Sequence, residues 1–153
     1  MDLILWRHAE AEEAAAGGDD LKRALTTKGE RQAERMAEWL NHRLTDSTRI
    51  LVSPALRCQQ TAKALGRKFR TVAALGPSAS AEELIAVAGW PDAAQPVLVV
   101  GHQPTLGEAA ALLLGGAPQP WAVKKGAAWW LRHRPRSDDG AIVLQAVQSP
   151  DSL

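Results

Sequence analysis

The sequence lacks several features that would fix a compartment or a chemistry. Its 153 residues include a single cysteine, Cys58, which excludes an internal disulfide and suits a reducing cytoplasm. No apolar run approaches the roughly 20 residues that a membrane-spanning helix needs. The first residues lack the basic segment and apolar stretch of a signal peptide. We therefore expect a cytoplasmic protein that does not enter a membrane.

Neither sign of charge is in excess. Lysine and arginine together number 18, and aspartate and glutamate 17, so the formal net charge is +1. This balance predicts no nucleic-acid partner and no attachment to an anionic membrane surface. With 46% hydrophobic and 23% charged residues, we expect one globular domain over residues 1–153. Any recognition of an anion must therefore be local.

Several catalytic motifs are also missing. The sequence has no Gly-x-Ser-x-Gly, His-Glu-x-x-His or Gly-x-x-x-x-Gly-Lys, which argues against a serine hydrolase, a zinc site and a nucleotide triphosphatase. A cysteine phosphatase needs Cys-x5-Arg, but the sixth residue after Cys58 is Ala64. We expect neither a metal nor another cofactor.

What the sequence does contain is organised around the segment that begins at Leu3. Four bulky apolar residues, 3–6, lead directly to Arg7 and His8. An apolar run too short for a helix is typical of a strand buried on both faces, in a parallel sheet that helices cover. Ligands of such sheets bind just beyond the carboxyl ends of the strands. An arginine beside a histidine at this point indicates a site for an anion, such as a phosphoryl group.

Two further strand-to-helix junctions present polar side chains in the same way. Residues 50–52 predict a second strand, followed by Ser53 as a helix cap and by Arg57 in the first turn of that helix. Residues 97–100 predict a third strand, which leads to His102. If the three strands are parallel neighbours, these side chains meet in one cleft.

The remaining elements follow from periodicity and turn residues. An amphipathic helix begins near residue 27, where Thr27 forms a capping box with Glu30 and Thr26 is a rival cap. We also expect a loop at 10–20, which is either a solvated surface loop or a wall of the site. The other expected elements are a strand at 72–75, a helix at 80–87 capped by Ser80, a helix at about 104–114, strands at 127–133 and 142–147, and a turn at 137–140. The last two strands pair as an antiparallel hairpin at a sheet edge.

The residue types favour phosphoryl transfer. Arginine forks suit the equatorial oxygens of a phosphoryl group in the transition state. A neutral imidazole can attack phosphorus in line and form a covalent phosphohistidine. One of His8 and His102 must then be the nucleophile, and the other can stabilise the phosphoryl oxygens as a cation.

Four motifs, in order, resemble those of the histidine phosphatase superfamily. Residues 5–10 resemble its Arg-His-Gly motif, with Ala9 in place of the usual glycine. Residues 25–29 are similar to Leu-Thr-x-x-Gly, and residues 53–62 to Ser-Pro-x-x-Arg-x-x-Gln-Thr-Ala. Residues 99–104 resemble the segment with the second histidine, and the chain length is similar to that of the small bacterial phosphohistidine phosphatase branch.

The resemblance implies a role for each matching residue. His8 would be the nucleophile, and Arg7, Arg57 and His102 would hold the phosphoryl group. Related small phosphatases have an arginine before the Leu-Thr element, so Arg23 is either a further phosphate-binding residue or a solvated loop cation. The implied fold is a single three-layer α/β/α sandwich with a mostly parallel sheet, similar to phosphoglycerate mutase. The implied partner is a histidine-phosphorylated protein.

The motifs contain no evident general acid. Superfamily members that act on alkyl phosphates have a carboxylate near the third strand, for which Glu82 and Glu83 are the nearest candidates here. The plainer interpretation is that both residues lie in the first turn of a helix, where acidic side chains are favoured by the helix dipole. An imidazole leaves more easily than an alkoxide, so a missing acid favours phosphohistidine as substrate. A small-molecule phosphomonoesterase and a phosphate-dependent binding module without turnover stay open.

Other polar side chains have plainer interpretations. Lys124 and Lys125 belong to the rim of the cleft or to a solvated turn, and His42 and His133 are surface or packing residues.

Overall fold

The computed structural model describes residues 1–135 and 141–153, so the turn predicted at 137–140 lies outside the described residues. The strands are β1 (Asp2–Arg7), β2 (Arg49–Val52), β3 (Arg70–Thr71), β4 (Val97–Gly101), β5 (Ala128–His133) and β6 (Ile142–Gln148). The helices are α1 (Thr27–Asn41), α2 (Leu56–Lys63), α3 (Ala81–Ala88) and α4 (Thr105–Gly115), with short 3₁₀ turns η1 (Asp20–Lys22), η2 (Ala73–Leu75) and η3 (Pro150–Ser152).

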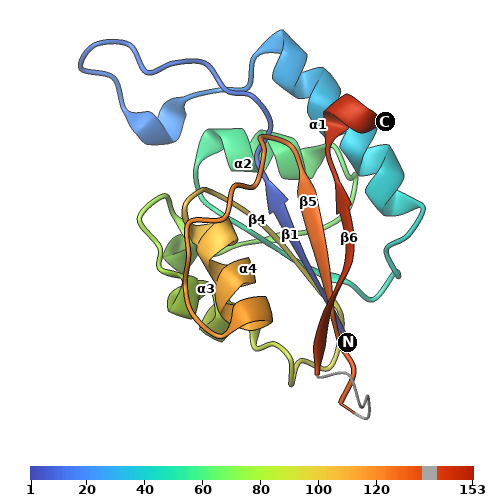
Figure 1. Ribbon diagram of the computed structural model, residues 1–153. Helices are drawn as coiled ribbons and strands as arrows, with labels where there is room; N and C mark the ends of the chain where they lie inside the picture. Colours follow the sequence, from blue (N-terminus) through green and yellow to red (C-terminus); the bar gives the residue numbers. More distant parts are fainter. Residues whose placement is uncertain (136–140) are drawn as a thin grey trace.

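The strands form one sheet in the order β3-β2-β4-β1-β5-β6. The four strands from β3 to β1 run parallel, whereas β5 pairs antiparallel with β1 and β6 antiparallel with β5. Helices α1 and α2 cover one face and α3 and α4 the other, as Figure 1 shows. The predicted three-layer sandwich with a mostly parallel sheet and an antiparallel edge hairpin is confirmed.

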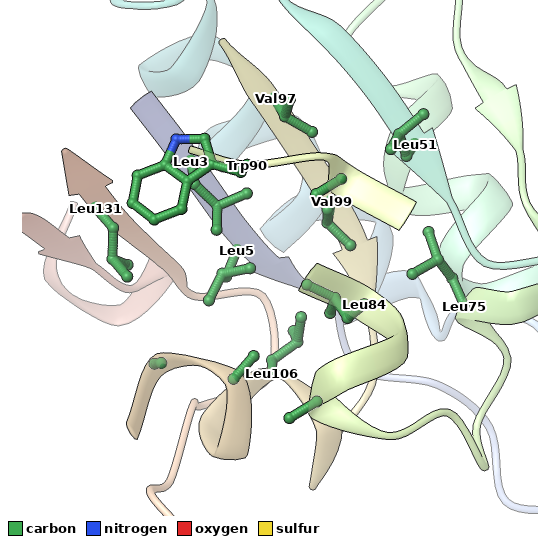
Figure 2. Close-up of a cluster of buried hydrophobic side chains, with 14 of the residues drawn as sticks. Leu3, Leu5, Leu51, Leu75, Leu84, Trp90, Val97, Val99, Leu106 and Leu131 are labelled. Carbon is green, nitrogen blue, oxygen red and sulfur yellow. The ribbon is translucent and has the colours of Figure 1, made fainter. Parts of the chain in front are cut away.

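Both faces of the sheet are buried, which explains the continuous apolar run of β1. Leu3 and Leu5 belong to the cluster under α3 and α4, in which Figure 2 shows Leu5 near Leu106. The intervening side chains, Ile4 and Trp6, belong to the cluster under α1 and α2. Burying one such side chain stabilises the fold by about 1.5–3 kcal/mol. In the described parts of the chain, every helix is too short or too polar to cross a lipid bilayer.

The structure decides between the two caps predicted for α1, the helix that begins at Thr27, in favour of the rival cap. Its N-cap is Thr26, whose hydroxyl accepts a hydrogen bond from the amide of Gly29 at 2.9 Å. The capping box predicted for Thr27 and Glu30 is therefore wrong, because the helix begins one residue earlier than that box requires.

The strand predicted at 72–75 is also wrong. The parallel pairing of β3 with β2 covers only Arg70 and Thr71. The amide of Val72 makes one more bond to the sheet, 2.9 Å from the carbonyl oxygen of Val52. The chain then closes into η2 through a bond from Leu75 back to Val72, and this turn buries Leu75.

The chain makes one long excursion between β1 and α1. Its two ends are joined by an isolated antiparallel bridge between Ala11 and Leu25, and the segment between them projects beyond the carboxyl end of β1 (Figure 1). Helix α1 packs closely against this junction at Gly29, where a Cβ atom would lie 1.9 Å from the carbonyl oxygen of Glu10. The glycine of the Leu-Thr-x-x-Gly element thus lets α1 approach the backbone just after His8.

Candidate active site

The three predicted junctions meet at one edge of the sheet. The amide of His8 donates to the carbonyl of Gly101 at 3.2 Å, and the amide of Ser53 donates to that of Val100 at 3.1 Å. The ring centres of His8 and His102 lie 5.5 Å apart, with the ring planes inclined at 58°. Parallel pairing of β1 with β4 therefore brings both histidines into one small volume, and pairing of β2 with β4 adds the second junction.

His8 is held in the form that a nucleophile needs. The residue is only 6% exposed, and Nδ1 lies 2.7 Å from the carbonyl oxygen of Ala9. A carbonyl oxygen only accepts, so Nδ1 carries the hydrogen and Nε2 of the neutral ring holds the lone pair. Burial, with smaller contributions from His102, Arg57 and Arg7, lowers the pKa of His8 to about 3. The ring is therefore neutral at pH 7 and can attack phosphorus.

Side chains of the second junction and of α2 hold His102, and one of these contacts joins its Nε2 to Sγ of Cys58 at 3.5 Å. The same Nε2 lies 2.7 Å from the hydroxyl oxygen of Ser53, and Nδ1 accepts from Nη2 of Arg57 at 3.4 Å. Burial, and next the charge of Arg57, lowers the pKa of His102 to about 4. With these neighbours the ring is neutral at pH 7, which differs from the cation expected from the sequence. An anion beside the ring favours the protonated form and so opposes this shift.

The contact with His102 also corrects the role predicted for Ser53. The N-cap of α2 is Ala55. The hydroxyl of Ser53 accepts from the amide of Ala55 at 3.2 Å and faces the histidine, so the residue tightens the turn and orients the imidazole.

Two arginines lie beside the histidines, and each has an N–H group without a hydrogen-bond partner among the described residues. Arg57, 4% exposed, comes from the first turn of α2, and Arg7 donates through Nη1 to the carbonyl of Val123 at 2.9 Å. Burial, and next the charge of Arg57, lowers the pKa of Arg7, so the two cations share one poorly solvated volume. Among the described residues, the Nε atoms of both arginines are buried without a hydrogen-bond partner. Buried donors without partners are costly, and an anion would satisfy them.

Arg23 reaches this cluster through a carboxylate. Its Nη1 donates to Oδ1 of Asp20 at 3.1 Å, and its Nε donates to the carbonyl of Glu12 at 2.7 Å. The other carboxylate oxygen of Asp20 accepts from Nη2 of Arg57 at 3.1 Å. The structure therefore connects Arg23 to Arg57 through Asp20, a residue that sequence reasoning did not single out.

Thr61 is a second residue that sequence reasoning missed, although it lies within the quoted motif. Its buried hydroxyl accepts from the amide of Ala9 at 3.1 Å and donates to the carbonyl of Arg57 at 2.7 Å. Ala9, whose carbonyl fixes the His8 ring, is thereby tied through its amide to the helix that carries Arg57. The Gln-Thr-Ala part of the motif was the signal that pointed to this residue.

The other candidates lie at the margin of the site or away from it. Lys124 and Lys125 are exposed on the segment whose neighbours bond to Arg7 and to the carbonyl of His8. Glu83 completes a capping box with Ser80 at the start of α3. Three further candidates do not contact the cluster: His42 and Glu82 are exposed, and His133 packs edge-on against Trp90. Within residues 1–135 and 141–153, no group of three His, Cys, Asp or Glu side chains is placed to hold a metal ion.

Comparisons with known proteins agree with this geometry. A family model described as the histidine phosphatase superfamily (branch 1) matches residues 3–78. An uncharacterized protein of Picosynechococcus sp. is 35% identical, over 95% of this chain and 90% of that protein. The phosphohistidine phosphatase SixA homolog of Haemophilus influenzae is 32% identical, over 75% of this chain and 78% of that protein. The structure of the protein histidine phosphatase SixA complexed with tungstate superposes with a TM-score of 0.78 at 28% identity, covering 99% of both chains.

Proposed function

Because the chain belongs to the histidine phosphatase superfamily, in its SixA-like branch, we propose that it hydrolyses phosphohistidine on a protein through a phosphorylated His8. The observation that carries the proposal is the pairing of a neutral His8, with its Nε2 lone pair available, and two buried arginines with unpartnered donors. We further propose that residues 1–153 form one catalytic domain that works in the cytoplasm without a metal ion, a nucleic acid or a membrane.

The proposed reaction has two steps. Nε2 of His8 attacks phosphorus in line while the bond from phosphorus to the substrate imidazole breaks, and its electron pair stays on that nitrogen. Arg7 and Arg57 hold the equatorial oxygens, where negative charge accumulates. His102 joins them once the anion has favoured protonation of its ring, because only then does Nδ1 carry a hydrogen to donate. Water then attacks phosphorus of the phosphorylated His8, releasing inorganic phosphate and regenerating the neutral ring. In this scheme Arg23 assists phosphate binding through its link to Arg57.

The state of the neighbouring carboxylate supports phosphohistidine as the substrate. An alkoxide leaving group needs a proton from a general acid. Hydrogen bonding to Arg23, together with the pairing to Arg57, lowers the pKa of Asp20, so this side chain is ionised at pH 7 and has no proton to give. An imidazole that is protonated on its far nitrogen leaves without such help.

A panel of substrates tests the proposal. We expect kcat/KM for a phosphohistidine peptide to exceed that for a phosphoserine peptide or a sugar phosphate by orders of magnitude. His8→Ala should abolish turnover and His42→Ala should leave it unchanged, and the quenched wild type should carry an acid-labile, alkali-stable phosphoryl group. Undiminished activity of His8→Ala would remove His8 from the mechanism. Phosphate binding without phosphate release from any substrate would mean a binding module instead.

A small-molecule phosphomonoesterase is the second candidate, and one contact favours it. The hydroxyl of Thr105, three residues after His102, donates to the carbonyl of Ala79 at 2.7 Å, which holds the start of α3 next to the start of α4. Glu82 and Glu83 are in that first turn of α3. If a sugar phosphate is the best substrate and Glu82→Gln or Glu83→Gln removes the activity, a carboxylate is the acid and this function replaces the first.

A further inference from the structure

The guanidinium of Arg57 is held by one edge. Nη1 donates to the backbone carbonyl of Asp20 at 2.8 Å, and Nη2 donates to a carboxylate oxygen of the same residue at 3.1 Å. Backbone and side chain of one residue thus accept from both terminal nitrogens. The side chain of Asp20 is 52% exposed, whereas that of Arg57 is 4% exposed, so the contact reaches from the surface loop into the site.

The other edge of the guanidinium faces the histidines. A guanidinium can present two forks to an anion, one made by its two terminal nitrogens and one made by Nε with the neighbouring Nη2. Asp20 occupies the first fork. In the second fork, Nη2 lies 3.4 Å from Nδ1 of His102, and Nε is buried with no partner among the described residues. An anion between the two histidines and Arg57 would therefore be held by the second fork.

We propose that Asp20 is a positioning residue, which fixes one fork of Arg57 so that the other fork is aimed at the phosphoryl group. The carboxylate also accepts from Arg23 at 3.1 Å, and its negative charge lets two arginines stay close that would otherwise repel each other. Because Asp20 occupies the first fork only, a phosphoryl group does not have to displace it.

The inference rests on the proposed function, so its first test measures binding without turnover. Tungstate, an oxyanion that mimics a phosphoryl group, is titrated calorimetrically into the wild type, Asp20→Asn and Asp19→Asn. Asp19→Asn is a matched control, because Asp19 caps η1 by accepting from the amide of Leu21, and asparagine caps equally well. Both variants remove one negative charge from the same turn, but only Asp20 contacts the arginines.

The two variants should behave differently. Removal of a negative charge near an anion site strengthens anion binding if nothing else changes, and we expect only this small effect in Asp19→Asn. In Asp20→Asn we expect tungstate affinity to fall about 10-fold and kcat for a phosphohistidine peptide to fall about 10- to 100-fold, because a misaligned donor loses most in the transition state. In an Arg57→Lys background the same substitution should have little further effect, because Asp20 acts through Arg57.

The outcomes separate the inference from the proposed function. Tungstate affinity or kcat that stays the same or rises in Asp20→Asn, in an active wild type, overturns the positioning role alone, and a rise would mean that the carboxylate competes with the phosphoryl group. Equal losses in Asp19→Asn, or an undiminished loss in the Arg57→Lys background, overturn it as well. A wild type that neither binds tungstate nor releases phosphate overturns the proposed function together with the inference.

Discussion

Acid should destabilise this fold mainly through the two histidines of the site. Unfolding exposes their rings to water, where the pKa returns to about 6.5, whereas in the folded protein it is about 3 for His8 and about 4 for His102. Below pH 6.5 the two rings therefore bind protons in the unfolded chain but not in the folded chain. Both rings are neutral in either state above this pH, so the penalty is absent there, and it grows as the pH falls toward the folded-state values.

The size of the effect follows from the same pKa values. Integrating the proton uptake from pH 7.5 to pH 5 gives a loss of about 2 kcal/mol for each histidine, or about 4 kcal/mol for the pair. This is a large share of the roughly 5–15 kcal/mol that stabilises a typical domain. Tungstate or phosphate should restore part of the loss, because an anion in the site makes protonation of the rings less costly.

Urea unfolding at the two pH values measures the loss, with His8→Asn and His102→Asn compared to the wild type. Asparagine at position 8 keeps a side-chain donor for the carbonyl of Ala9 but cannot take up a proton. We expect each variant to lose about 2 kcal/mol less on acidification than the wild type, whereas the exposed His42→Asn should match the wild type. Equal acid sensitivity in all four proteins would refute the reasoning, since it would assign the effect to carboxylates.

Three further predictions concern catalysis. Activity should survive EDTA, and vanadate should inhibit competitively as a mimic of pentacoordinate phosphorus, both measured by phosphate release. Arg57→Ala should lower kcat by about 10²–10³ through loss of a transition-state contact, and Arg57→Lys should recover only part, because an ammonium cannot fork two oxygens. Thr61→Val should lower the free energy of unfolding by about 1–3 kcal/mol, measured with urea, and should also lower kcat, because the amide of Ala9 then lacks its acceptor. Thr61→Ser keeps the hydroxyl and should retain the stability and the kcat of the wild type.

Each of these predictions has a contrary result. Loss of activity on chelation, with recovery on adding a divalent ion, would indicate a metallophosphatase. Full activity of Arg57→Lys would show that net charge alone matters at this position. Unchanged kcat in Thr61→Val would mean that the His8 peptide is held adequately by other contacts.

The fold and the convergence of four polar side chains could be predicted because their signals are local. The apolar run of β1 and the polar residues directly after it are adjacent in the sequence, and parallel packing then brings Arg7, His8, Arg57 and His102 to one edge. The errors in secondary structure are of one or a few residues and occur where a tertiary contact decides the boundary. Ser53 is an example, because its hydroxyl serves a histidine that lies 49 positions further along the chain.

Asp20 and the neutrality of His102 could not be predicted in the same way. Asp20 lies in a loop for which the sequence left two interpretations, a solvated surface or a wall of the site, and its importance depends on the path of that loop back to α2. The pKa of a ring depends on burial by elements from distant parts of the chain and on the side chains that face it. In both cases the residues in contact are far apart in the sequence, so a pattern within a short stretch of sequence cannot predict the contact.

The way the excursion between β1 and α1 is closed bears on how such phosphatases diversify. Its two ends are adjacent, because the amide of Glu12 bonds to the carbonyl of Ala24 at 2.7 Å and the Ala11–Leu25 bridge lies directly beside this bond. Insertions within residues 12–24 therefore need not move the sheet or α1, and doubling the length of such a loop costs only about 0.6 kcal/mol of closure entropy. The same excursion carries Asp20 and Arg23. The length and composition of this one segment can thus change and alter what reaches the nucleophile, while the scaffold that orients the imidazole keeps its contacts.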